Sequence, residues 1–70
     1  MKRVRHYRAG EYEIICEGID EATLEPVIVY KSLYAAKDFA AGTIWVRRKK
    51  IFDEMVEFEG KQVPRFTIIS

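Results

Sequence analysis

The segment GEYEIICEGI, residues 10–19, constrains the fold more than any other part of the chain because its apolar and polar residues alternate. Tyr12, Ile14 and Cys16 fall on one face, and most of the glutamates between them fall on the other. Alternation with a period of two predicts an antiparallel strand with one buried face and one face in water. Cys16 is therefore expected to be a small buried core residue rather than a reactive thiol.

Three other segments have the composition of strands. PVIVYKSLY, residues 26–34, is apolar on both faces and is expected to be a central strand that begins with a proline. TIWVRR, residues 43–48, predicts a third strand. VEFEGKQVPRFTII, residues 56–69, predicts a hairpin whose turn, residues 59–62, contains a glycine where a positive φ is needed. Pro64 places its strand at an edge or at a bulge.

Two connecting segments carry weaker local signals. KKIFDEM, residues 49–55, predicts one helical or 3₁₀ turn that directs Ile51, Phe52 and Met55 toward the core. AAKDFAAG, residues 35–42, is expected to be a loop with at most a single helical turn, because it is short and ends in glycine.

These elements predict a mainly all-β domain. Five short strands, with one short helical turn before the fourth, match a small five-stranded SH3-like barrel best. An OB-like barrel is the second choice, because that fold usually needs a longer helix. Residues 1–70 form one domain, in which residues 1–5 are either a flexible basic arm or a segment ordered against the barrel. We expect a chain of this length to be stable by roughly 3–5 kcal/mol.

Composition and charge indicate the environment of the protein rather than its ligand. The net charge of +1 is too small to indicate nucleic-acid binding by itself. The single cysteine excludes an intramolecular disulfide and suits a reducing compartment. The basic N-terminus is not followed by the apolar run of a signal peptide, and no run approaches the roughly 20 residues of a membrane span. A cytoplasmic protein without a membrane partner is therefore expected.

Four blocks follow one another along the chain: RHYRAGEYE, EATLEPVIVYKSLY, IWVRR and VEFEGKQVPRF. Together they resemble a bacterial family of small SH3-like domains of unknown function, the one numbered sixteen fifty-three. The resemblance extends from about Arg5 to Phe66, and it implies a small β-barrel and a bacterial origin but no activity. Two features differ from the family pattern. WVRR replaces the usual WVRP, and the loop YAAKDFAAGTIW is longer than the usual glycine-rich loop and adds Phe39.

The residue types needed for metal binding or nucleophilic catalysis are scarce. Zinc needs about four nitrogen or sulfur ligands, whereas the chain has one histidine and one cysteine. Asp20, Glu21 and Glu25 lack the spacing of an EF-hand loop, and no glycine-rich phosphate-binding motif is present. We expect no metal, no cofactor and no catalytic residue. The alternative, an enzyme, would need a pocket at His6, Cys16 or a carboxylate with a shifted pKa.

Four consecutive cations, residues 47–50, follow closely after the only tryptophan, Trp45. One interpretation is nucleic-acid binding, with these cations and the basic N-terminal arm on phosphates and with Trp45, Tyr34 or Tyr30 stacked on bases. The other is a solvated strand end whose cations pair with carboxylates in residues 53–57. Trp45 shares a strand face with the first of the cations, so the pair forms either an exposed aromatic–cation surface or a core residue beside a snorkelling arginine.

Arginines next to aromatic residues favour a protein- or peptide-binding module, with nucleic-acid binding as the alternative. Trp45-Val46-Arg47 and Pro64-Arg65-Phe66 both have this arrangement. His6 is either a pH-sensitive binding group or a packed one. The chain is expected to be a monomer or a weak homodimer formed through an exposed strand edge. The candidate binding residues are His6, Tyr7, Tyr34, Trp45, Arg47, Arg48, Lys49, Lys50, Arg65 and Phe66.

Overall fold

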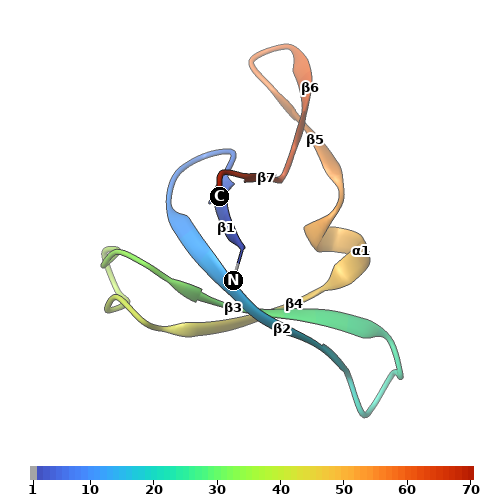
Figure 1. Cartoon of the computed structure of the whole chain (residues 1–70). Helices are drawn as coiled ribbons and strands as arrows, with labels where there is room; N and C mark the ends of the chain where they lie inside the picture. The colour runs from blue at the N-terminus through green and yellow to red at the C-terminus, as the bar shows by residue number, and fades with distance from the viewer. Residues whose placement is uncertain (1) are drawn as a thin grey trace.

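The computed structural model describes residues 2–70, and most of them belong to β-strands (Figure 1). The mainly β class is confirmed, and so is a short helical turn ahead of the C-terminal hairpin. None of the described residues forms a helix long and apolar enough to cross a membrane. In chain order the elements are β1 (Arg3–His6), β2 (Glu11–Ile19), β3 (Pro26–Ser32), β4 (Ile44–Arg48), α1 (Lys49–Phe52), β5 (Met55–Phe58), β6 (Lys61–Pro64) and β7 (Phe66–Ile68).

Five strands form one antiparallel sheet in the order β4-β3-β2-β1-β7. β3 lies between β2 and β4, which confirms the expected central strand. The sheet curves but is not closed into the expected SH3-like barrel (Figure 1). The reason is that the chain between the two edge strands, residues 49–65, forms α1 and a separate β5–β6 hairpin instead of a strand that joins the edges.

The basic N-terminal segment is an inner strand of the sheet rather than a flexible arm. β1 pairs with β2 on one side and with β7 on the other, and Val4 lies opposite both Tyr12 and Ile68. Val4 is also the most completely buried side chain, at 1% exposure. The arginines on either side of it project to the opposite face, because successive strand residues alternate. Of residues 1–5, which the sequence predicts to be either a flexible arm or an ordered segment, residue 1 lies outside the described part of the chain.

A β-bulge in β2 moves Cys16 out of the core. Ile14 lies opposite Tyr30, but Cys16 lies opposite Val29, so Ile15 is an extra residue in the pairing. An extra residue reverses the alternation beyond it. Cys16 consequently points to the outer face and is exposed, and the expectation of a buried cysteine is wrong.

The core lies between the inner face of the curved sheet and α1. Phe52 of α1 is buried, and its ring stacks on that of Phe66 at 4.1 Å with an interplanar angle of 8°. Met55, expected to point inward with Phe52, is 51% exposed because it already belongs to the β5–β6 hairpin. The buried cluster is Val4, Ile28, Tyr30 and Phe52, with Tyr12, Ile14, Trp45 and Phe66 packed against it.

The C-terminal hairpin has the expected turn. β5 and β6 are joined by Glu59 and Gly60, with φ angles of 53° and 78°. Positive φ at both central residues is the geometry that hairpins favour in two-residue turns. Figure 1 shows this hairpin extending away from the main sheet. Pro64 ends β6, which pairs only with β5. The other edge of β6 has no neighbouring strand, so no backbone hydrogen bond on that edge needs the N–H group that proline lacks.

Val4 and Val46 allow one chemical change to be compared at two strand positions. We expect Val4→Ala to lower the free energy of unfolding by about 2 kcal/mol, because it removes buried methyl groups. Val46 is 63% exposed, so Val46→Ala should cost less than about 1 kcal/mol, mainly through strand propensity. Urea denaturation followed by tryptophan fluorescence measures both values. Equal losses would contradict the burial of β1 inside the sheet.

Cys16 provides a test of the bulge. We expect a thiol-specific reagent such as dithionitrobenzoate to modify Cys16 in the folded protein without denaturant, because the side chain is exposed. Cys16→Ser should change the free energy of unfolding by less than about 0.5 kcal/mol. A thiol that reacts only after denaturant is added would place Cys16 in the core and remove the bulge.

Candidate functional site

The inner face of the sheet, defined as the face that packs on α1, brings together aromatic and basic residues from different strands. Tyr30 of β3 lies opposite both Ile14 of β2 and Trp45 of β4. His6 of β1 lies opposite Phe66 of β7. Residues that are directly opposite in antiparallel strands project on the same side of the sheet. Sequence positions far apart therefore meet on one surface.

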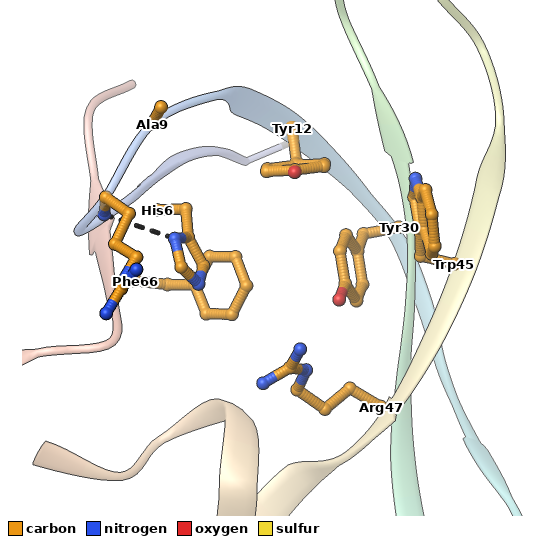
Figure 2. A pocket seen from close by; sticks show the side chains of 8 residues that line it. His6, Ala9, Tyr12, Tyr30, Trp45, Arg47 and Phe66 are labelled. Carbon is orange, nitrogen blue, oxygen red and sulfur yellow. Dashed lines mark hydrogen bonds between the residues drawn. The ribbon is translucent and has the colours of Figure 1, made fainter. Parts of the chain in front are cut away.

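A hollow of about 310 Å³ opens on this inner face (Figure 2). We call it the arginine hollow. Its volume is at the lower end of the range of about 300–1,000 Å³ that is usual for ligand sites. Within residues 2–70, no carboxylate lines it. Tyr12, Tyr30, Trp45 and Phe66 form its walls, His6 and Arg47 supply polar groups, and Arg8 and Ala9 complete the rim.

His6 is held in one orientation inside the hollow. Its Nδ1 accepts a hydrogen bond from the backbone N–H of Arg8 at 3.2 Å, so the proton of the neutral ring is on Nε2. The ring packs edge-on against Phe66 at 5.1 Å. Burial lowers the pKa of His6 below 6.5, and the nearby positive charges of Arg47, Arg65 and Arg8 lower it further. At neutral pH the imidazole is therefore an uncharged hydrogen-bond donor.

Arg47 enters the hollow because it follows Trp45 by two residues on β4 and therefore shares its face. Its Cζ lies 6.0 Å from the centroid of the Phe66 ring, which is a cation–π distance. None of the ion pairs formed within residues 2–70 includes Arg47. The guanidinium is therefore a partly buried charge without a carboxylate partner in the described chain.

Tyr30 adds a hydroxyl to the same space. Figure 2 shows this hydroxyl on the side of its ring that faces the Arg47 guanidinium. Burial raises the pKa of Tyr30 above 10.0, and the positive charge of Arg47 acts in the opposite direction. The hydroxyl consequently stays protonated at neutral pH and can donate or accept a hydrogen bond.

The other three cations of the 47–50 run lie outside the arginine hollow and have carboxylate partners. The Nε of Arg48 is 3.7 Å and the Nζ of Lys50 is 3.8 Å from Glu25. The Nζ of Lys49 lies 3.5 Å from Asp53, one turn further along the chain. The structure thus separates four adjacent cations into one that faces the aromatic hollow and three that form ion pairs elsewhere.

A second hollow, of about 320 Å³, adjoins the arginine hollow, and Tyr12 and Trp45 line both. Tyr34 and Phe39 line only this second hollow, and the ring of Phe39 packs edge-on against Trp45 at 4.8 Å. The Nε1 of Trp45 is buried and has no hydrogen-bond acceptor among residues 2–70. In Figure 2 this nitrogen lies at the end of the indole away from Arg47. Trp45 thus separates the two hollows together with Ala9 and Tyr12, which also line both.

The candidate residues identified from the sequence are distributed over several places. His6, Trp45, Arg47 and Phe66 meet in the arginine hollow, and Tyr34 lies in the second hollow. Arg48, Lys49 and Lys50 do not reach either hollow. Tyr7 lies behind His6, with ring centroids 4.8 Å apart. Arg65 donates hydrogen bonds to the Ile51 carbonyl at 3.1 Å and to Glu54 at 3.2 Å, so its guanidinium supports α1 rather than the hollow.

Sequence reasoning did not identify Arg8, Ala9 or Tyr12 as site residues. The alternation of residues 10–19 places Tyr12 on the buried face of its strand, and the sequence singles out Tyr30 only as one possible base-stacking residue. The alternation of β2 and β3 does place these two tyrosines on the sheet face that carries Trp45. The alternation does not predict where the inner face opens to solvent, because that position depends on how much of the face α1 covers.

The molecule is a small, mainly β domain with an open five-stranded sheet and a basic, aromatic-lined hollow on its inner face. The chain belongs to the family described as "Protein of unknown function (DUF1653)", whose model matches residues 2–68. No curated protein and no solved structure matches the chain significantly.

His6 is the only histidine, so its titration can be followed by a single imidazole signal in the NMR spectrum. We expect a pKa below 6.5 in the folded protein. Arg47→Gln should raise the pKa by removing a repelling charge, but not fully to 6.5, because burial is the larger cause. The contribution of His6 to stability is complete above pH 6.5 and is lost as the pH falls through the folded-state pKa. A wild-type pKa at or above 6.5 would contradict the placement of His6 in the hollow.

Proposed function

We propose that this domain is a binding module that recognises an extended peptide, or an extended segment of a protein, through the two adjoining hollows. The single observation that supports this most strongly is the partly buried guanidinium of Arg47, which has no carboxylate partner among residues 2–70. A buried charge without a partner is unfavourable. An anionic group on a ligand would therefore gain a charge-assisted hydrogen bond at a place that the described chain leaves open.

The aromatic walls favour a ligand that also carries apolar groups. Tyr12, Tyr30, Trp45 and Phe66 present ring faces and edges around Arg47, and such surfaces contribute through burial and ring packing. With volumes of about 310 and 320 Å³, the two hollows are each of a size for one or two side chains. An extended peptide that places neighbouring groups in adjoining pockets fits this arrangement better than a single bulky ligand.

The nucleic-acid alternative receives less support from the arrangement of charge. Arg48, Lys49 and Lys50 are in ion pairs with carboxylates of the same chain. Arg3 and Arg5 lie on the face of β1 opposite to Val4, and Val4 belongs to the same face as the hollow. Arg8 and Arg47 do line one hollow, and Lys2 and Lys49 line another. The opposite direction of Arg3 and Arg5 and the ion pairs of residues 48–50 nevertheless interrupt the continuous basic surface that favours phosphate-backbone binding.

A peptide display library tests the proposal, with Arg47→Gln and Arg48→Gln as a matched pair of variants. We expect selected peptides to bind the wild-type domain with micromolar dissociation constants, measured by calorimetry and by the emission of Trp45. Arg47→Gln should weaken binding by about tenfold or more, because the guanidinium contacts the ligand. Arg48→Gln, which removes an exposed ion pair on the other face, should change it by less than about twofold.

Two results would contradict the proposal. One is a library that yields no peptide above background at low salt. The other is an equal effect of the two substitutions, which would assign binding to general positive charge rather than to the hollow. Amide spectra of both variants control for folding.

A further inference from the structure

We propose that Arg47 and His6 together hold a carboxylate, and that this carboxylate is the C-terminus of the bound peptide. The inference deepens the peptide-binding function proposed above and rests on it. Three features of the arginine hollow support it: the arrangement of donors, the amount of positive charge, and the wall formed by Phe66.

The donors in the hollow match the acceptors of a carboxylate. Figure 2 shows the His6 ring and the Arg47 guanidinium on two sides of the same space, with the hydrogen-bonded Nδ1 of His6 directed away from it. The free Nε2–H and the guanidinium N–H groups are donors only. A carboxylate has two oxygens and accepts in the plane of a guanidinium, which makes it the natural group to fill a space that donors line on both sides.

The amount of charge in the hollow suits an anion with a single negative charge. His6 is neutral at neutral pH, so it adds a hydrogen bond without adding a charge. The charge of Arg65 is shared with Glu54. Arg8 is exposed at the rim, and its Nε donates to the Tyr7 hydroxyl at 3.2 Å. Of the two arginines that line the hollow, Arg8 is exposed and Arg47 is partly buried, so the charge of Arg47 is the one that water screens less. One such charge suits a carboxylate.

The wall of the hollow favours a chain end over an internal residue. Phe66 bounds the arginine hollow and is backed by Phe52 of α1, to which its ring is stacked at 4.1 Å. The second hollow adjoins at Trp45, which lies on β4, and Phe66 lies on β7 at the other edge of the sheet. A peptide that passes Trp45 from the second hollow therefore reaches Arg47 and then meets the Phe66–Phe52 pair, and a chain that ends there needs no further path. An internal aspartate or glutamate would need the main chain to turn out of the hollow toward solvent before this wall.

A pair of small molecules that differ in one group provides the direct test. N-acetyl-L-phenylalanine has a free carboxylate, and N-acetyl-L-phenylalaninamide has none. Binding is measured by NMR titration of the Trp45 indole N–H and the His6 ring signals. We expect the acid to bind about tenfold more tightly than the amide to the wild type. Arg47→Gln should reduce this ratio to about one, and Arg48→Gln should preserve it, with both variants shown to be folded by their amide spectra.

The peptides selected by display separate this inference from the proposed function. Each is compared with a free and with an amidated C-terminus. If amidation leaves the affinity unchanged while Arg47→Gln still weakens it, the C-terminal carboxylate is overturned and peptide binding stands. If a peptide with an amidated end and an internal aspartate binds as well as the free acid, the position of the carboxylate is wrong. If inorganic phosphate displaces the acid at lower concentration than acetate does, the class of anion is wrong.

Discussion

The stacking of Phe52 on Phe66 is the contact on which the rest of the structure depends. Phe66 lies on the edge strand β7, and Phe52 lies in α1, which directly follows the other edge strand, β4. No backbone ladder joins these two edges within residues 2–70. The two parallel rings, 4.1 Å apart, connect them through side chains instead. An aromatic contact thus does in this domain what strand pairing does in a closed barrel, and it leaves the sheet open beside it.

Strand alternation explains why one arginine differs from its neighbours. Along β4, Trp45 and Arg47 face inward, whereas Val46 and Arg48 face outward. Because strand residues alternate between the two faces, Arg47 points inward while Arg48, the next cation on the same strand, points outward. Once inside, Arg47 is surrounded by rings rather than carboxylates, so its charge is both less hydrated and less neutralised than that of the exposed cations.

The sequence predicts the individual strands and turns of this fold better than it predicts whether the sheet closes into a barrel or where the candidate site lies. Alternation in residues 10–19 and the Glu59–Gly60 turn are local signals, and the structure contains both. The bulge at Ile15 is not visible in a residue pattern, because it is a choice of register between two strands. β1 was missed because Val4 is its single buried apolar residue among cations. The hollow was missed for a related reason, since it lies where α1 stops covering the inner face, and that boundary depends on tertiary packing.

The pairing of β1 with β7 brings the two ends of the described chain together. The N–H of Arg3 donates to the carbonyl of Ser70 at 3.2 Å, and the N–H of Ile69 donates to the carbonyl of Arg3 at 2.9 Å. A short linker is therefore enough to connect the two ends covalently. The Glu59–Gly60 turn lies at the tip of a hairpin that extends away from the sheet, so the chain can be opened there to give new termini. The domain is thus a natural candidate for circular permutation, and a permuted form would present the same two hollows with its termini at the tip of the β5–β6 hairpin.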